Sequence, residues 1–302
     1  MGPFVTTPED VWERSIALPT IDREWLARVF ADMDPSLADR EWSVLAGGLR
    51  SVNLRSGELV ARVSVGEMAS VRREAELMRC LAARLCVPEV LEVSDVTLLM
   101  RFVPHAPLPA SDDAGRAVGA TAAAIHAVTL ASAGMLDDAL EIREPWRSAL
   151  DGLREHVDML LDGGAGRRLG ARAGAIRTLW DRHSERMQDA ARTPVLVHSD
   201  FKPTNVKWTT DGRVLVLDWE FAWSGPALFD VGQLLRWDPP REFVEGFATG
   251  YRDAGGSLPE GWRETAMLYD LFNLVFFAND EANRPRRDRD VLERIDRTLA
   301  AL

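Results

Sequence analysis

Lysine is almost absent from this chain of 302 residues. Among its 36 Lys and Arg side chains, only Lys202 and Lys207 are lysines. No Gly-Lys-Ser or Gly-Lys-Thr sequence occurs, which excludes a P-loop NTPase, because that class uses the lysine of this motif to reach phosphates. A lysine that persists against such a bias towards arginine suits a task that needs a compact point charge. We therefore single out Lys202, whereas Lys207 is more simply a surface residue.

Net positive charge is also lacking. The net charge is −11 and the sequence pI is about 5.1. This argues against nucleic acid as the main partner, since binding to phosphate backbones needs a basic surface. The surplus of acid fits a cationic substrate, although solubility alone would also explain it.

Cysteines and long apolar runs are equally scarce. The two cysteines, Cys80 and Cys86, form neither a metal motif nor a disulfide framework, which predicts a reducing, cytoplasmic compartment. The first ten residues lack the basic start and apolar core of a signal peptide. Residues 118–136 carry no Asp, Glu, Lys or Arg but are rich in Ala, Gly, Ser and Thr. Their weak hydropathy predicts a buried helix and no membrane association.

The pattern of apolar residues changes twice along the chain. A helical segment is followed by short strands and one helix up to about Val103, and three prolines (Pro104, Pro107 and Pro109) then form a linker to a mostly helical remainder. The predicted elements are a helix at 24–33, strands at 42–45, 52–54 and 59–65, a helix at 69–85, and strands at 90–93 and 97–103. We read 163–166, Gly-Gly-Ala-Gly, as a flexible connection between helices. The chain is long enough for two lobes, which we place at 1–103 and 104–302 in an α+β fold.

The chemistry concentrates in one stretch. An apolar strand at 195–197 leads to Asp200, Asn205 follows five residues later, and a second apolar strand ends at Asp218. This is the layout of the catalytic loop and metal strand of eukaryotic-like kinases, in which Asp orients the attacking hydroxyl while Asn and the second Asp hold Mg²⁺. A turn between the strands can place an amide oxygen and a carboxylate on either side of such an ion. We predict Asp200 and Lys202 as catalytic residues and Asn205 and Asp218 as metal ligands.

Further motifs extend this pattern over both halves of the chain. They are Leu45-Ala46-Gly47-Gly48, Ser51, Asn53, Arg73-Glu74-Ala75-Glu76, Val87-Pro88-Glu89-Val90-Leu91, Leu98-Leu99-Met100, His198-Ser199-Asp200, Asn205, Leu217-Asp218-Trp219-Glu220, Gly225-Pro226 and Phe229-Asp230-Val231. With these motifs, roughly residues 42–230 resemble the aminoglycoside phosphotransferase and choline kinase superfamily, and Ser199 stands where the family usually has Gly. The resemblance implies a bilobal protein-kinase-like fold, with a sheet-rich N-lobe and a mostly helical C-lobe. It also implies that His198 ties the loop together and that Asp230 braces it, although capping of a helix explains Asp230 equally well.

The nucleotide site implied by the resemblance departs from the kinase pattern at one position. Kinases pair a lysine of the third strand with a helix glutamate and the ATP phosphates, but here the register of 59–63 places Arg62 there, with Glu74 as its partner and Glu76 as the alternative. Arg can bind phosphate in a bidentate manner, so the role is feasible. The remaining predicted nucleotide contacts are Gly47, Gly48, Ser51, Asn53, Met100, Arg101 and Val103. The nucleotide is ATP, with GTP possible.

An acceptor site is predicted from a C-terminal helix at 267–283. Asp270, Asn273, Phe277 and Glu281 follow at spacings of three, four and four, which places them on one helical face. With Glu220, they would line the cleft for a cationic acceptor. The alternative is a solvated polar face whose acids pair with the seven arginines between Arg263 and Arg297.

The sequence therefore predicts a Mg²⁺-dependent kinase that phosphorylates a hydroxyl of a small molecule, most simply an aminoglycoside-like or other antibiotic, as in resistance enzymes. A metabolic kinase acting on choline, homoserine or a sugar is the first alternative. A nucleotide-binding pseudokinase is the second, favoured by the missing N-lobe lysine and disfavoured by the intact Asp200, Asn205 and Asp218. A protein kinase is disfavoured because no Ala-Pro-Glu sequence follows Asp218. Whether the protein is a monomer or a dimer stays open.

Overall fold

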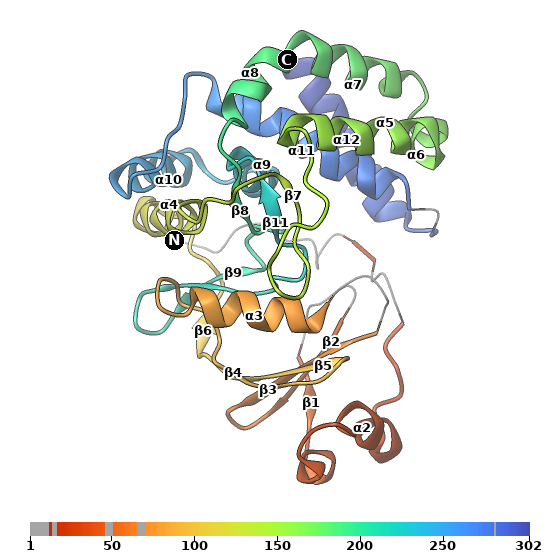
Figure 1. Cartoon of the computed structure of the whole chain (residues 1–302), viewed down its shortest axis with the longest axis vertical. Helices are drawn as coiled ribbons and strands as arrows, with labels where there is room; N and C mark the ends of the chain where they lie inside the picture. Colours follow the sequence, from red (N-terminus) through yellow and green to blue (C-terminus); the bar gives the residue numbers. More distant parts are fainter. Residues whose placement is uncertain (1–11, 14–16, 46–50, 66–69, 281) are drawn as a thin grey trace.

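The computed structural model describes residues 12–13, 17–45, 51–65, 70–280 and 282–302. Three predicted site residues, Gly47, Gly48 and Glu281, lie outside these ranges. The described chain forms a sheet-rich lobe and a larger helical lobe, drawn at the bottom and top of Figure 1. The predicted α+β fold with two lobes is therefore confirmed.

A five-stranded antiparallel sheet forms the core of the smaller lobe. Its order is β1-β2-β3-β5-β4. The strands are β1 (Ser43–Val44), β2 (Ser51–Ser56), β3 (Leu59–Ser64), β4 (Val90–Val93) and β5 (Thr97–Arg101). In the register of the sheet, Arg62 lies opposite Asn53 on one side and Leu98 on the other. All five strands were predicted to within a few residues.

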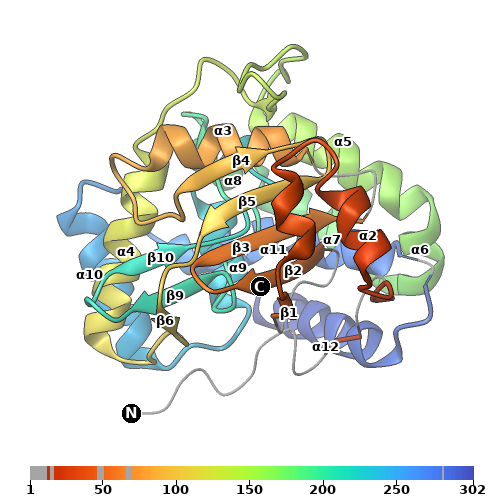
Figure 2. The ribbon, with the colours of Figure 1, turned by 90° about the horizontal axis from the view of Figure 1, so that it is seen from below.

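Two helices cover the opposite faces of this sheet (Figures 1 and 2). Because successive side chains of a strand alternate between its faces, Ala61 and Val63 pack with α2 (Arg23–Val29). Arg62 instead points to the face covered by α3 (Val71–Leu81), where its side chain meets Glu74. A 3-10 turn, η1 (Pro35–Asp39), extends the α2 side. The alternation thus places the buried side chain of Arg62 on the face of the sheet that α3 covers.

The larger lobe consists of helices around two small antiparallel sheets. The helices are α4 (Asp112–His126), α5 (Ala149–Asp162), α6 (Gly164–Leu169), α7 (Ala171–Arg182), α8 (Ser184–Ala190), α9 (Leu228–Leu235), α10 (Arg241–Asp253), α11 (Trp262–Ala278) and α12 (Pro285–Ala301). One sheet has the order β10-β9-β6 and consists of β6 (His105–Ala106), β9 (Val206–Thr209) and β10 (Val214–Val216). The other has the order β7-β11-β8 and consists of β7 (Gly134–Met135), β8 (Val195–Val197) and β11 (Trp223–Gly225).

Close packing of α4 against α10 positions the end of α4. A Cβ atom added at Gly119 would lie 2.1 Å from the carbonyl oxygen of Phe247, so only glycine permits this approach. The contact carries His126, the last residue of α4, to Tyr251 of α10. The packing of these two helices therefore brings His126 and Tyr251 within hydrogen-bond distance.

Three predicted segments differ from the structure. The helix predicted within 118–136 ends at His126, because Val128 and Thr129 instead pair with the strand around Val195. The helix predicted at 267–283 begins earlier, at Trp262 after the left-handed Gly261, and ends at Ala278. The Gly-rich stretch at 163–166 is helical from Gly164 onwards. Within the described residues, no helix is both long and apolar enough to span a membrane.

Candidate active site

The loop between β8 and β9 holds Asp200 between two donors. Lys202 Nζ lies 2.8 Å from Asp200 Oδ2, and Asn205 Nδ2 donates to the same oxygen at 2.8 Å. Burial by itself raises the pKa of Asp200, but the charge and hydrogen bond of Lys202 and the Asn205 amide outweigh it and hold that pKa below its ordinary value. Asp200 is therefore an ionised carboxylate, fixed in place and able to accept a hydrogen bond from a hydroxyl.

Asn205 and Asp218 lie on adjacent segments. The Leu217 N–H donates to the Asn205 carbonyl at 2.9 Å, which joins the end of β10 to the loop. Asn205 uses its amide nitrogen on the carboxylate and carbonyl of Asp200, so its amide oxygen is directed elsewhere. Asp218 has a backbone φ of 68°, a left-handed conformation that is uncommon for a residue other than glycine. Both side chains thus offer hard oxygen atoms on segments joined to each other, and Asn205 lies directly against Asp200.

Arg62 is surrounded by three carboxylates. It forms an ion pair with Glu74, and its Nη2 lies 2.6 Å from Asp218 Oδ1 and 3.0 Å from Glu220 Oε2. The side chains of Arg62, Glu74 and Glu220 are all at most 8% exposed. Burial raises the pKa of Glu220 to about 7 although Arg62 acts against it, and burial likewise raises the pKa of Glu74. One guanidinium thus faces three carboxyl groups where β3, α3 and the end of β10 meet, and burial makes it costly for all three to be ionised at once.

These groups fit a magnesium ion. Mg²⁺ prefers oxygen ligands and is usually bound by only a few protein groups together with phosphate oxygens. The Asn205 amide oxygen and the Asp218 carboxylate are such a pair, and the Arg62 nitrogen that pairs with Asp218 also pairs with Glu220. Among the described residues, no group of three or more His, Cys, Asp or Glu side chains forms a metal site. A site made by the protein alone is therefore not indicated, whereas a shared site with a nucleotide is compatible with the geometry.

A chain of hydrogen bonds supports the loop that carries Asp200. The two carboxylate oxygens of Asp230, on α9, accept from the backbone N–H groups of His198 and Ser199, each at 2.8 Å. His126 Nε2 lies 3.2 Å from Asp230 Oδ2, and its Nδ1 lies 2.8 Å from the Tyr251 hydroxyl. Ser199 has a φ of 67°, so these hydrogen bonds stabilise a backbone conformation that serine residues rarely adopt. Asp230 thus caps the loop's amides, as the resemblance implied.

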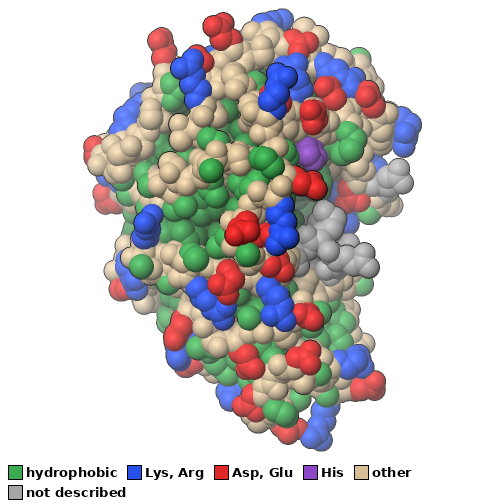
Figure 3. Space-filling view, in the orientation of Figure 1, with side chains coloured by type: hydrophobic (Ala, Val, Ile, Leu, Met, Phe, Trp, Pro, Cys, Tyr) green, Lys and Arg blue, Asp and Glu red, His purple; other side chains and the backbone are tan. Residues whose placement is uncertain are grey.

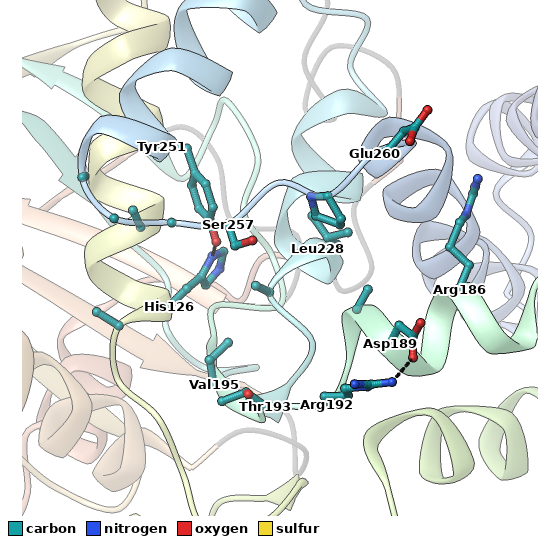
Figure 4. Close-up of a pocket in the computed structure, with 18 of the residues that line it drawn as sticks. His126, Arg186, Asp189, Arg192, Thr193, Val195, Leu228, Tyr251, Ser257 and Glu260 are labelled. Atoms are coloured by element: carbon teal, nitrogen blue, oxygen red, sulfur yellow. Dashed lines mark hydrogen bonds and ion pairs between the residues drawn. The ribbon is translucent and has the colours of Figure 1, made fainter.

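A cavity of about 820 Å³ is lined by His126 and Tyr251, the two members of these hydrogen bonds that lie furthest from the loop (Figure 4). His126 and Tyr251 lie at one end of it, and the ion pair of Arg192 with Asp189, 2.7 Å long, lies towards the other. None of the predicted site residues lines it. His126 was not predicted as a site residue, and its sequence signal is weak: a lone histidine at the end of an alanine-rich helix.

The predicted adenine contacts lie at the strand that leaves the sheet. Met100 and Arg101 end β5, and the Arg101 side chain is exposed and pairs with Glu89. The backbone N–H of Arg101 donates to the Glu89 carbonyl at 2.9 Å, and the Val103 carbonyl lies 2.7 Å from His105 Nδ1. Two of the backbone groups expected to meet a base therefore already have partners. Ser51 and Asn53 lie on β2, and Asn53 is directly opposite Arg62.

The predicted acceptor residues are not gathered in one place. Glu220 pairs with Arg62, whereas Asp270 on α11 forms a buried ion pair with Arg236, with Nε 2.8 Å from Oδ2. Asn273 is buried and donates weakly to Asp270 at 3.4 Å. Phe277 packs against Trp12, with ring centroids 4.9 Å apart. Asp270 is thus neutralised by an arginine, but it is buried rather than solvated, and Arg236 is not among the arginines between Arg263 and Arg297.

We expect Asp270→Ala to destabilise the fold rather than impair acceptor binding. Removing one partner of a buried ion pair leaves the other charge uncompensated, which typically costs about 3–5 kcal/mol. The free energy of unfolding in urea should fall by that order, with the acceptor KM little changed. Glu245→Ala is the matched control, because its pair with Arg241 is exposed and should contribute little. A raised acceptor KM without loss of stability would contradict this assignment.

Comparisons with known proteins agree with the geometry. The profile of the phosphotransferase enzyme family matches residues 41–268, and the chain belongs to this family. It is thus a small-molecule phosphotransferase with a protein-kinase-like fold. A search of curated proteins found no match.

Solved structures with the same fold come from several phosphotransferases. A putative fructosamine-3-kinase from Thermobifida fusca is 21% identical, with 93% of this chain and 100% of that chain covered and a TM-score of 0.68. The ADP-bound aminoglycoside phosphotransferase APH(2'')-Ib is 18% identical, with 91% and 97% covered and a TM-score of 0.64. A choline/ethanolamine kinase family protein from Mesorhizobium loti is 20% identical, with 92% and 93% covered and a TM-score of 0.64. At these identities the likeness shows the fold alone.

Proposed function

We propose that this protein transfers the terminal phosphoryl group of ATP to a hydroxyl group of a small molecule. The observation that carries the proposal is the ionised Asp200, fixed by Lys202 and Asn205 in a loop that is hydrogen-bonded to Leu217, the residue before Asp218. Asp200, Asn205 and Asp218 argue against a pseudokinase, since each position retains the side chain that the chemistry requires. GTP in place of ATP stays open.

In the proposed reaction, Asp200 accepts a hydrogen bond from the acceptor hydroxyl and aligns its oxygen with the γ-phosphorus. The oxygen–phosphorus bond forms, the bond to the bridging oxygen of the nucleotide breaks, and the hydroxyl proton passes to Asp200. Phosphoryl transfer of this kind depends mainly on positioning and on neutralising charge. Lys202 Nζ, 2.8 Å from the Asp200 carboxylate, supplies positive charge next to the reacting atoms.

Asn205 and Asp218 would hold a magnesium ion in this scheme. When bound, the ion would neutralise charge on the nucleotide phosphates. The protein's own contribution is the placement of the two oxygen ligands, through the Leu217–Asn205 hydrogen bond and the Arg62–Asp218 ion pair. We propose that Arg62 also meets the nucleotide phosphates, with Ser51 and Asn53 on the neighbouring strand and Met100, Arg101 and Val103 near the base.

The acceptor is proposed to be a hydroxyl-bearing antibiotic, or else a small metabolite such as choline, homoserine or a sugar. Two described acids of the α11 region already have basic partners: Asp270 pairs with Arg236, and Asp280 pairs with Arg284 and Arg287. On the face drawn in Figure 3, acidic and basic side chains are interspersed rather than segregated. Both features favour an acceptor with little positive charge over a polycationic aminoglycoside.

An acceptor screen tests the proposal directly. Nucleotide consumption is measured with Mg²⁺ and ATP or GTP over antibiotics, amino alcohols and sugars, and each product is weighed by mass spectrometry. We expect one chemical class to yield a product heavier by one phosphoryl group, with Asp200→Asn as the inactive control. Tight nucleotide binding without turnover on any acceptor would favour the pseudokinase alternative instead.

A further inference from the structure

Arg73 and Glu74 of α3 form hydrogen bonds with the backbone of the two residues that follow Asp218. Glu74 Oε1 accepts a hydrogen bond from the Trp219 N–H at 3.2 Å, and Arg73 Nη2 donates to the Glu220 carbonyl at 2.7 Å. Helix α3 is thereby attached to the backbone immediately following the proposed metal ligand. Glu74 has a second partner in Arg62, but Arg73 has no such role in the proposed nucleotide site.

The same guanidinium reaches a second segment of the helical lobe. Arg73 Nη1 donates to the Leu136 carbonyl at 2.9 Å, just after β7. Arginine presents its N–H groups as a rigid planar fork, so one side chain can bridge two carbonyls in fixed directions. Arg73 therefore ties the sheet-rich lobe to two backbone segments of the other lobe at once.

Arg73 makes these bonds without a carboxylate partner among the residues that the structure describes. Burial lowers the pKa of Arg73, and no ion pair of Arg73 occurs among the described residues, although the charges of Asp138, Glu220 and Glu74 act weakly in the opposite direction. Its Nε is buried without a hydrogen-bond partner. Burying a charge in this way is costly, and the two carbonyl contacts are its only hydrogen bonds in the described part of the chain.

The backbone at Asp218 needs such support. Its φ of 68° is a sparsely populated conformation, and such conformations persist only where the surroundings hold them. We propose that Arg73 is a positioning residue, which holds the segment 218–220 so that the Asp218 carboxylate faces the metal–nucleotide complex. This inference rests on the proposed function, because it assigns Arg73 a part in that same site.

Arg72 offers a matched control. It precedes Arg73 on α3, but its side chain is exposed and pairs with Asp95 on the surface. Arg72→Ala therefore removes the same charge from the same helix without touching the 218–220 segment. Arg73→Lys keeps the charge but lacks the fork, so it cannot bridge both carbonyls in the same geometry.

Two measurements do not depend on the acceptor or on turnover. Amide hydrogen exchange of peptides covering 217–222 reports the mobility of the segment, and electron paramagnetic resonance of Mn²⁺ reports its binding with ATP. We expect Arg73→Ala to speed exchange in this peptide and to weaken Mn²⁺–ATP binding about 10-fold or more, the size seen when partners that orient metal ligands are removed. Arg73→Lys should lie between Arg73→Ala and wild type, and Arg72→Ala should match wild type within about twofold.

The outcomes separate this inference from the function on which it rests. If wild type does not bind Mn²⁺–ATP, the proposed function fails. If wild type binds it and the folded Arg73 variants bind equally well with unchanged exchange, the positioning role is overturned. Should Arg73→Ala not fold, as judged by circular dichroism, Arg73→Lys carries the same comparison. With an acceptor in hand, Arg73→Lys should raise the KM for the metal–nucleotide while leaving the acceptor KM unchanged.

Discussion

Asp200→Asn should lower kcat by a factor on the order of 10²–10⁴, the usual contribution of a positioned general base. The substitution preserves the shape of the side chain but removes the charge that, in the proposed reaction, orients the acceptor hydroxyl and takes its proton. Asp200 contacts Lys202 and Asn205, and its loop is held independently through Asp230. We therefore expect the dissociation constant of the nucleotide, measured by calorimetry, to stay near that of wild type.

Asp211→Asn is the matched control for this effect. Asp211 lies in the turn after β9 and pairs with the exposed Arg213, so its loss should leave kcat unchanged. A kcat of Asp200→Asn within tenfold of wild type would show that another group positions the hydroxyl.

Arg62→Ala should have the second large effect, on stability as well as on nucleotide binding. The substitution leaves Glu74, Asp218 and Glu220 without their common counter-charge, and breaking a buried ion pair typically costs about 3–5 kcal/mol. The free energy of unfolding, measured in urea, should fall by at least this order. The KM for ATP of the remaining folded enzyme should rise, and Arg62→Lys should retain appreciable activity because it keeps the charge.

Arg79→Ala tests whether these losses are specific to the buried position. Arg79 lies on α3 in an exposed pair with Glu76, where removal of the charge should change stability little. An unchanged KM for ATP in Arg62→Ala would exclude Arg62 as the phosphate anchor and leave the phosphate charge to be met elsewhere, with Lys202 the nearest candidate.

The parts of the site that could be predicted from the sequence are those encoded by short spacings. Asp200 and Asn205 lie in the loop between β8 and β9, and Asp218 follows β10, which pairs with β9, so the nearness of these segments follows from local geometry. The pairing of Arg62 with Glu74 follows from strand register and the next helix, and the structure contains that ion pair. Its role towards a nucleotide stays a prediction.

Contacts between distant residues could not be read from the sequence. Asp270 is paired by Arg236 from another helix, and His126 meets Asp230 although 104 positions separate them. A helical face rich in acids looks the same in sequence whether it lines a cleft or packs against an arginine. Arg73 illustrates the same limit, since its partners are backbone carbonyls, which carry no sequence signal.

The ion pair between Arg62 and Asp218 bears on the stability of the protein when no metal ion is bound. A structural metal typically holds a chain together, so chelators unfold such proteins. Here a side chain already bridges the carboxylates of both lobes, from Glu74 on α3 to Asp218 after β10. Stripping divalent ions with a chelator should therefore leave the melting temperature unchanged. In the proposed site, Asp218 would exchange part of its contact with the Arg62 guanidinium for the ion, so that binding would replace one positive charge by another.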